Sequence, residues 1–405
     1  MKWLIIGLVV FLFVVDSFIL KLMTKKPKTI DPRTFEIYDQ EAYIKWDRYQ
    51  KDKVRLSLIS KFVNFSMILL FLVFNLHVLI YKYAQTLTLC TICQNMYFLF
   101  FVLIIFVPIN ILFSYIRIFK VEEKHGFNTQ TIKLFVKDTI IETILTLSLE
   151  FGVIIGLNYL LVMTDIWFLI YGVLIGNFFI VLSVLLLPLF NRLFNTFKPL
   201  EEGSLRDNIT NLLNKTNVSV SKILVMNASK RTKKMNAYFT GFGSKKRIVL
   251  YDTILTGLEE DEVLAVLAHE LGHAKHKDVL RMLPMSILSL SLFIVLSYYV
   301  STFDLLSKAF GFERANFVFS LLILFEVIDI VIKVIQIPQN KFIRTMEYKA
   351  DKFASIHAGK SNMINALIKL TKTNFSDLNP DPLLVTLLYD HPTTFQRIDA
   401  IETLD

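Results

Sequence analysis

The sequence predicts an α-helical, polytopic membrane protein in which seven transmembrane helices are joined to a polar part of mixed α and β structure. Two observations predict the membrane class. The chain of 405 residues is 54% hydrophobic and contains 36 Phe, which is more than an ordinary globular domain needs. Long apolar stretches also alternate with basic segments, so the formal net charge of +9 is spread over loops. This pattern indicates loops beside anionic lipid and argues against a nucleic-acid partner.

Seven apolar stretches are each long enough to cross a bilayer, which takes about 20 residues. They cover residues 3–21, 62–82, 96–116, 139–162, 167–191, 282–302 and 316–337. The first stretch has the Lys2 and apolar run of a signal peptide, but it lacks a small-residue cleavage site and is followed at once by Lys25 and Lys26. We therefore expect it to be retained as a membrane helix.

The basic residues predict the orientation of the chain. Nine Lys and Arg lie in residues 22–60 and five in 116–138, and many more follow in 192–281 and after residue 337. Because cytoplasmic loops carry the excess of Lys and Arg, we expect the amino terminus outside. The large polar segments and the carboxyl terminus are then cytosolic.

The polar part of the chain is divided in two. We expect residues 1–191 to hold the first five membrane helices with their loops, and residues 282–337 to form a hairpin of the last two. Segments 192–281 and 338–405 then make up one polar domain. Any site that uses residues from both segments has to assemble across the membrane hairpin.

The first polar segment shows strand and turn signals. Residues 222–227 are rich in apolar and β-branched side chains and predict a strand. Residues 236–243 and 247–251 predict a hairpin that turns at 243–246, where the sequence is Gly-Ser-Lys-Lys.

A helix from about 258 to 278 follows the hairpin. Thr256 and Glu259 have the spacing of a capping box, which predicts its start. The helix places three leucines on its buried face: Leu264, Leu267 and Leu271.

This helix carries the motif His269-Glu270-Leu-Gly-His273. Two histidines four residues apart lie on one face of a helix and can reach one zinc ion, and the glutamate between them can act as general base on a water molecule. The alternative is a pair of core histidines on an amphipathic helix. The uncharged flanks, the small Gly272 and the helix start just upstream favour the metal site.

The second polar segment offers a third ligand. Asn340, Arg344, Glu347 and Asp351 recur at helical spacing and share one face. One interpretation is a solvated charged face with an Arg–Glu pair. The other makes Glu347 the ligand and Asp351, one turn on, the acceptor that holds an imidazole N–H. The spacing alone leaves both interpretations open.

The two motifs together resemble the type I CaaX prenyl protease family, whose members are integral-membrane zinc metalloproteases. The pair that carries the resemblance is His269-Glu-Leu-Gly-His273 with Glu347-Tyr-Lys-Ala-Asp351. Further segments match in the family's order, so the resemblance covers most of the chain: residues 122–128, 188–199, 236–242, 247–253, the stretch Asp390-His391-Pro392-Thr, and Arg397.

The resemblance implies a zincin-like protease domain with one Zn²⁺ per chain. It implies zinc on His269, His273 and Glu347, with Glu270 as the base. It also implies catalytic roles near the scissile carbonyl. The residues at those positions are His391 and Arg397, and His391 is the candidate hydrogen-bond donor to the oxyanion. Three further residues on the Glu347 helix would support the ligands or the oxyanion: Asn340, Arg344 and Asp351.

The family also implies where a substrate binds. Asn236, Ala237 and Tyr238 would form the edge strand to which a substrate pairs as an added β-strand. Family members enclose a water-filled chamber between seven helices, with the metal at its cytosolic end. Five acidic residues inside the apolar stretches support an interior of this kind, because charges that face lipid cost a few kcal/mol each: Asp16, Glu142, Glu150, Glu326 and Asp329.

The expected reaction is removal of the last three residues of a prenylated CaaX protein. An alternative is a quality-control zinc protease that acts on non-prenylated membrane proteins. A third possibility is a polytopic carrier or scaffold with a vestigial metal site. The expected partners are a prenylated or hydrophobic peptide or protein and the lipid bilayer, and we expect a monomer.

Two features depart from the eukaryotic members of the family. Ala274 stands where they commonly have Trp, and the chain ends soon after the His-Pro-Thr stretch without a di-lysine signal. These departures leave the endoplasmic reticulum and a bacterial inner membrane both open.

The chain has two cysteines, Cys90 and Cys93, in a lone C-x-x-C. Such a pair is a weak indication of metal or redox chemistry. Incidental residues of a short loop are the favoured interpretation.

Overall fold

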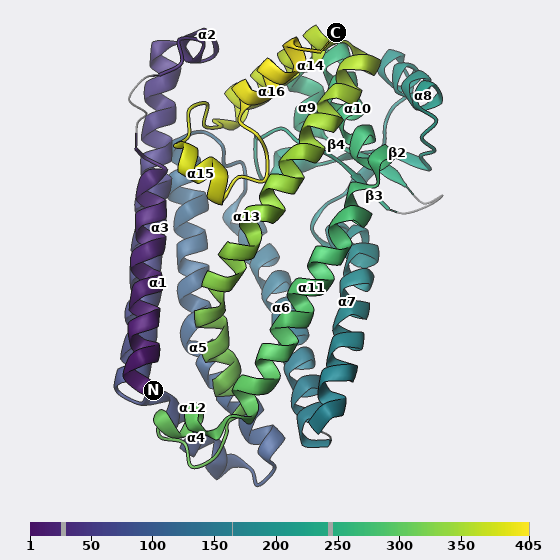
Figure 1. Cartoon of the computed structure of the whole chain (residues 1–405). Coiled ribbons are helices and arrows are strands. Elements are labelled where there is room, and N and C mark those ends of the chain that lie inside the picture. The colour runs from purple at the N-terminus through teal and green to yellow at the C-terminus, as the bar shows by residue number, and fades with distance from the viewer. Residues whose placement is uncertain (26–29, 164, 242–245, 405) are drawn as a thin grey trace.

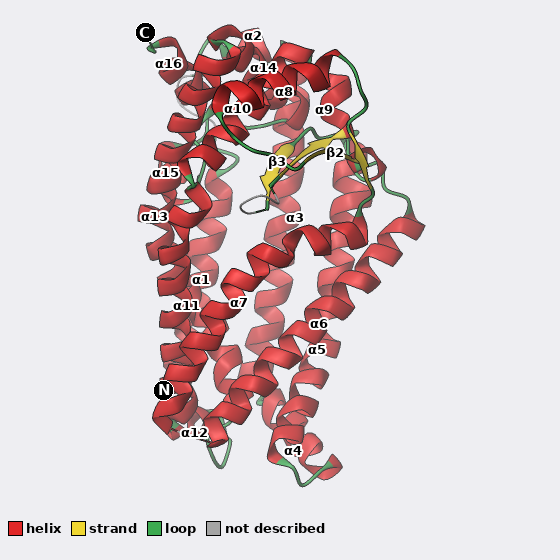
Figure 2. Ribbon diagram, turned by 90° about the vertical axis from the view of Figure 1, so that its right-hand side faces the viewer, coloured by secondary structure: helices red, strands yellow, loops and turns green. Residues whose placement is uncertain are grey.

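Long helices run side by side, and a small sheet with short helices covers one end of the bundle (Figures 1 and 2). The computed structural model describes residues 1–25, 30–163, 165–241 and 246–404. The long helices are α1 (Lys2–Leu22), α3 (Gln40–Val73), α5 (Thr91–Ile116), α6 (Ile132–Met163), α7 (Asp165–Phe194), α11 (Asp278–Thr302) and α13 (Phe317–Ala358). A π-helical turn, η1 (Arg117–Glu122), extends α5.

The two ends of the bundle differ. The amino terminus lies at one end, together with α4 (Leu76–Leu87) and α12 (Asp304–Ala309) (Figure 1). The other end carries the sheet and the short helices α2 (Thr34–Ile37), α8 (Ser204–Thr216), η2 (Ala228–Lys230), α9 (Asp252–Gly257), α10 (Glu260–His276), α14 (Lys360–Asn374), α15 (Pro382–Leu387) and α16 (Thr394–Glu402). The polar segments therefore gather at the end away from the amino terminus.

Five helices among the described residues are long and apolar enough to cross a membrane. They are Lys2–Leu22, Gln40–Val73, Thr91–Glu122, Ile132–Leu161 and Asp278–Thr302. The other two predicted spans, 167–191 and 316–337, fall on α7 and on the first half of α13. In α7 the apolar stretch is Phe168–Ser183, and the predicted span in α13 includes three charged residues: Glu326, Asp329 and Lys333.

The predicted span 62–82 is wrong as a single helix. Helix α3 ends at Val73 and α4 begins at Leu76. Between them Asn75 has a left-handed backbone with φ of 54°, a conformation that Asn tolerates better than most residues. Its side-chain oxygen accepts a hydrogen bond of 2.7 Å from Nζ of Lys2. The chain therefore turns where the sequence predicts a straight helix.

Charged residues inside the bundle pair with one another. Asp16 contacts Lys61 and Lys333, and Lys333 also contacts Asp329. A cavity of about 370 Å³ is lined by three of these residues and by Glu326. The prediction that these acids face an interior or one another holds for this group. The two remaining predicted acids are exposed on α6: Glu142 and Glu150.

A four-stranded sheet has the order β1-β2-β4-β3. Its strands are β1 (Phe197–Pro199), β2 (Lys222–Met226), β3 (Ala237–Thr240) and β4 (Arg247–Tyr251). Strand β2 runs parallel to β4 and antiparallel to β1, and β3 runs antiparallel to β4. The predicted strand and hairpin are confirmed. Most of the predicted turn lies outside the described residues, and the three-residue β1 was not predicted.

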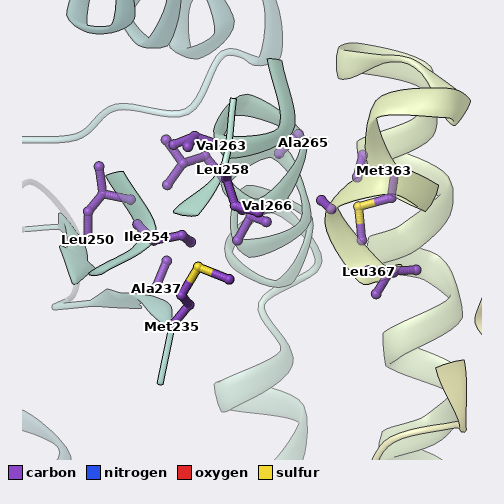
Figure 3. Packing of buried hydrophobic residues seen from close by; sticks show 14 of the residues in the cluster. Met235, Ala237, Leu250, Ile254, Leu258, Val263, Ala265, Val266, Met363 and Leu367 are labelled. Carbon is purple, nitrogen blue, oxygen red and sulfur yellow. The ribbon is translucent and has the colours of Figure 1, made fainter. Parts of the chain in front are cut away.

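Helix α10 lies between the sheet and α14 (Figure 3). On the sheet side it packs against Leu250 and Ile254, and on the other side it faces Met363 and Leu367. Burial of each large apolar side chain stabilises the fold by about 1.5–3 kcal/mol. This core fixes the position of the histidine helix relative to both polar segments.

The boundaries of α10 differ from those predicted. Thr256 is not the cap, because it belongs to α9; the capping box is made by Glu259 and Glu262, and N–H of Glu259 donates to Oε2 of Glu262 at 2.8 Å. At the other end Lys277 has a φ of 57°. This residue ends α10 before Asp278, which opens α11.

Candidate functional site

Helices α10 and α13 cross at Gly272. A Cβ built on Gly272 would lie 2.9 Å from Cα of Ala350, closer than real Cβ atoms come to other atoms, and would also make a tight contact of 3.2 Å with Cβ of Phe353. The absence of a side chain at Gly272 therefore lets the two helices meet. Their close approach brings Glu347, one turn before Ala350, to the histidine face of α10.

Three side chains from these helices converge. Nε2 of His269 lies 3.1 Å from Nε2 of His273. The Glu347 carboxylate approaches both rings, with Oε1 3.2 Å from Nε2 of His273 and Oε2 3.5 Å from Nε2 of His269. All three donor atoms lie within 4.8 Å of one another, and Glu347 is 3% exposed. The three predicted ligands form one group in which His269 and Glu347 are buried and His273 is half-buried.

The outer nitrogens of both rings contact carboxylates. Nδ1 of His269 donates to Oδ1 of Asp351, and Nδ1 of His273 donates to Oδ2 of Asp278, each at 2.8 Å. Neutral imidazoles held in this way carry their proton on Nδ1 and present a bare lone pair at Nε2. The two lone pairs then face each other.

Two facing lone pairs are unfavourable unless a cation lies between them. Among the described residues, buried Oε2 of Glu347 also has no hydrogen-bond partner. Burial lowers the pKa of His273, but its contacts with Glu347 and Asp278 outweigh burial and raise the pKa to about 9, so a proton on Nε2 supplies the positive charge when no metal does. The three side chains therefore favour a positive charge between them. Two imidazole nitrogens and one carboxylate are a ligand set of catalytic zinc sites.

Glu270 follows His269 on α10 and is half-buried. Burial raises the pKa of its carboxyl group, while His269 and His273 act in the opposite direction. A carboxylate whose pKa is raised is a better proton acceptor near neutral pH. The raised pKa of Glu270 is compatible with the general-base role that the sequence predicts for it.

Arg397 of α16 holds Asp351. Its Nε donates to Oδ2 at 2.8 Å and its Nη2 to Oδ1 at 2.6 Å, while Nη1 is 3.9 Å from Oε2 of Glu347. Such bidentate pairs fix geometry as well as charge. The structure places Arg397 against the carboxylate that orients His269.

His391 lies at the exposed side of the three candidate metal ligands, His269, His273 and Glu347, which we call the donor group. Its Nε2 is 3.4 Å from Oε1 of Glu347, its Nδ1 donates to Asp390 at 2.8 Å, and its side chain is 58% exposed. It can therefore reach a substrate that approaches the donor group from solvent.

Arg344 and Asn340 contact the segment that precedes His391. Nη1 of Arg344 donates to the backbone oxygens of Val385 at 2.9 Å and Tyr389 at 2.5 Å. Nδ2 of Asn340 donates to O of Leu387 at 3.3 Å. The two side chains share the ligand face of α13 as predicted, but their contacts position the α15 segment rather than the histidines.

Sequence reasoning missed Asp278. A helix continued through residue 278 would rotate it by about 140° from His273, away from that ring. The left-handed Lys277 instead returns the chain, so the first residue of α11 meets His273. An acid five residues after the second histidine was the available signal.

The predicted substrate strand is an edge strand. Ala237 and Tyr238 belong to β3, which pairs with β4 on one side and packs against α10. Asn236 precedes β3 and its backbone oxygen accepts from N–H of Tyr251 at 3.1 Å. The side chain of Asn374 contacts both N–H and C=O of Met235, at 3.0 and 3.1 Å. The Asn374 side-chain amide thus pairs with the Met235 backbone as a neighbouring strand would, just before β3 begins.

Comparison with known proteins connects this geometry to a family. The family model for peptidase family M48 matches residues 199–405, which include all three donors and Glu270. The chain belongs to peptidase family M48. A second model, described as CAAX prenyl protease N-terminal, five membrane helices, matches residues 19–196. The resemblance to the type I CaaX prenyl protease family is thus confirmed over both halves of the chain.

Relatives of this M48 peptidase match it over nearly its whole length. CAAX prenyl protease 1 of Saccharomyces cerevisiae is 30% identical over 94% of this chain and 89% of its own. The CAAX prenyl protease 1 homologue of Arabidopsis thaliana is 28% identical over 99% and 97%, and that of Homo sapiens 29% over 93% and 89%. The crystal structure of Ste24p from S. mikatae superposes with a TM-score of 0.92 at 28% identity, covering 99% of both chains. The chain is an integral, multi-pass membrane metallopeptidase.

Proposed function

We propose that this M48 peptidase is a zinc endopeptidase that removes the last three residues of prenylated CaaX proteins. The observation that carries the proposal is the convergence of His269, His273 and Glu347 beside Glu270. The substrate class is supported by relatives named CAAX prenyl protease 1 that match almost the whole chain.

His269, His273 and Glu347 would hold the zinc ion. When bound there, zinc supplies a Lewis acid that polarises the scissile carbonyl and acidifies water. The remaining groups keep the donors in place. Asp351 and Asp278 fix the two imidazole tautomers, and their contacts of 2.8 Å leave both Nε2 atoms free to bind metal.

Glu270 and His391 carry the proton transfers in this proposal. Glu270 takes a proton from the attacking water and returns it to the leaving amine, which its raised pKa favours. His391 donates from Nε2 to the carbonyl oxygen as negative charge develops on it. Its place 3.4 Å from Glu347, on the exposed side, supports this role.

The substrate would add to the sheet at β3. An extended peptide that pairs with Asn236, Ala237 and Tyr238 gains backbone hydrogen bonds without any demand on its side chains. Strand β3 lies at the end of the sheet order and packs against α10, which supports delivery of the peptide towards Glu270. A monomer contains all of these groups.

We further propose that seven helices span the membrane and enclose a chamber, with α7 and α13 added to the five apolar spans. The charged cavity beside Asp16 and Glu326 supports a polar interior. The amino terminus would be outside and the donor group cytosolic, with segments 192–281 and 338–405 forming the protease domain across the hairpin 282–337. The relatives described above are eukaryotic, which favours the endoplasmic reticulum over a bacterial membrane.

Metal analysis and paired peptides test the proposal. The purified protein should contain about one zinc per chain and release a tripeptide from a farnesylated CaaX peptide but not from the unmodified peptide. Equal cleavage of both peptides would replace this substrate class with non-prenylated membrane proteins. A protein that contains no zinc and cleaves neither peptide would favour the alternative of a polytopic carrier or scaffold with a vestigial metal site.

A further inference from the structure

Cys90 and Cys93 lie together at the start of α5, far from the donor group. The connection between α4 and α5 is at the end of the bundle opposite the sheet (Figures 1 and 2). These are the two cysteines of the chain. Nothing in the proposed peptidase reaction uses them.

The first turn of α5 brings the two cysteines together. Cys90 is the N-cap, and its Sγ accepts a hydrogen bond of 3.4 Å from N–H of Cys93. The N-cap and the third helical residue lie on the same side of the first turn, so the side chains of Cys90 and Cys93 start next to each other.

The turn is held from both sides. N–H of Cys90 donates to Oγ1 of Thr88 at 3.2 Å, and Nε2 of Gln94 donates to O of Thr88 at 2.9 Å. The hydroxyl of Tyr81 in α4 donates in turn to Oε1 of Gln94 at 3.4 Å. The thiols are therefore prearranged before any reaction.

Both thiols are accessible. Cys90 and Cys93 are exposed, and the neighbouring Leu89 is 98% exposed. A helix N-terminus stabilises the thiolate, which is the form of cysteine that reacts. A small disulfide can therefore approach a reactive thiolate at Cys90 without any rearrangement of the fold.

We propose that Cys90 and Cys93 form a dithiol–disulfide redox site that exchanges with low-molecular-weight disulfides such as oxidised glutathione. The Cys90 thiolate attacks one sulfur of the reagent, whose S–S bond breaks and releases one glutathione thiolate. Cys93 then loses its proton and attacks the sulfur of Cys90, which releases the second glutathione thiolate. The two protein thiols give up two electrons and two protons, and oxidised glutathione becomes two molecules of the thiol.

Thiol trapping on the full-length protein tests this site. The detergent-solubilised protein is equilibrated with graded ratios of reduced and oxidised glutathione, quenched with acid and alkylated with a maleimide. Because the chain has two cysteines, whole-protein mass reports on this pair alone. We expect both thiols to become protected together, with loss of two hydrogens and recovery in dithiothreitol.

The variant Cys93→Ser separates the two steps. It should accumulate the mixed disulfide of Cys90 with glutathione, since the resolving thiol is missing, while Cys90→Ser should react at least about fivefold more slowly. Wild-type protein that stays fully alkylatable at every ratio would overturn the proposal. So would two separate glutathione adducts without an internal disulfide. The wild-type result does not depend on the folding of a variant or on peptide cleavage.

Discussion

Asp278 accepts a hydrogen bond of 2.8 Å from Nδ1 of His273 across the break between α10 and α11. The pair is the counterpart of Asp351 and His269, where the distance is the same. Each of the two histidine ligands thus has its own buried carboxylate, Asp278 at 7% and Asp351 at 1% exposure. The two carboxylates come from different segments of the chain, so tertiary structure assembles the ligand supports as well as the ligands.

The substitution Asp278→Ala should weaken zinc binding by about 10–100-fold, because His273 loses the acceptor that fixes its tautomer. Competition with a chromophoric chelator measures the affinity directly. Asp304→Ala is the matched control, since Asp304 also opens a helix, and that helix, α12, lies at the end of the bundle opposite the sheet (Figure 1). Equal zinc affinity for Asp278→Ala and the wild type would show that the contact does not support the ligand.

Gly272→Ala should separate α10 from α13, because the new Cβ would meet the backbone of Ala350 at 2.9 Å. We expect a lower thermal unfolding midpoint and at least about tenfold weaker zinc binding, since Glu347 moves with α13. Gly152→Ala makes the same change in α6, where nothing lies within 4 Å. That control should be neutral or stabilise the helix by about 0.5–1 kcal/mol. If both variants behave alike, the close approach does not limit the geometry of the site.

Arg344→Ala should lower kcat/KM by about tenfold or more and leave the zinc content at the wild-type value. The guanidinium holds the backbone of Val385 and Tyr389, so its loss frees the segment that positions His391. Lys341→Ala on an exposed face of the same helix serves as the control. Loss of zinc from Arg344→Ala would instead place this residue among the supports of the ligands.

The pH dependence of stability should include a contribution from Asp377. Burial raises its pKa to about 6, and Lys53 and N–H of Asn379 only partly oppose this shift. The charge of Asp377 in turn contributes to the raised pKa of three tyrosines, for which burial is the larger cause: Tyr38, Tyr43 and Tyr389. The folded pKa exceeds the unfolded value of about 3.9, so the fold prefers the protonated form. The stabilisation is complete below about pH 4 and is lost as pH rises through about 6.

Asp377→Asn removes this titration. The variant should gain stability relative to the wild type at pH 8, by about 1 kcal/mol after allowance for partial solvent screening, and the gain should shrink at pH 5. Thermal unfolding midpoints at both values measure it, with exposed Asp207→Asn as the control. A gain that is equal at both pH values would contradict the assignment to Asp377.

The parts of the fold that follow from local pattern were predictable. The spacing of His269 and His273, and of Glu347 and Asp351, is set by helix periodicity, so their shared faces were evident without a structure. The hairpin of β3 and β4 followed from alternation and turn residues. The family resemblance then joined the two helices into one site.

What escaped prediction depends on single backbone conformations and distant partners. Asn75 and Lys277 have left-handed backbones. Asn75 interrupts the apolar stretch 62–82, and Lys277 ends the helix predicted for residues 258–278. The turn at Lys277 also brings Asp278 to His273. The carbonyl partners of Arg344 belong to a segment more than 40 residues on. Spacing on one helix indicates which residues share a face, but it does not identify what that face contacts.

The initial rate of tripeptide release from a farnesylated CaaX peptide by Glu270→Gln shows whether Glu270 is the general base of a zinc-dependent peptidase. The amide keeps the shape of Glu270 but cannot accept the proton from water. The zinc-loaded variant should retain about one zinc per chain and lose activity by about 10²–10⁴-fold. A zinc-loaded Glu270→Gln protein that releases the tripeptide at the wild-type rate would contradict a general-base role for Glu270.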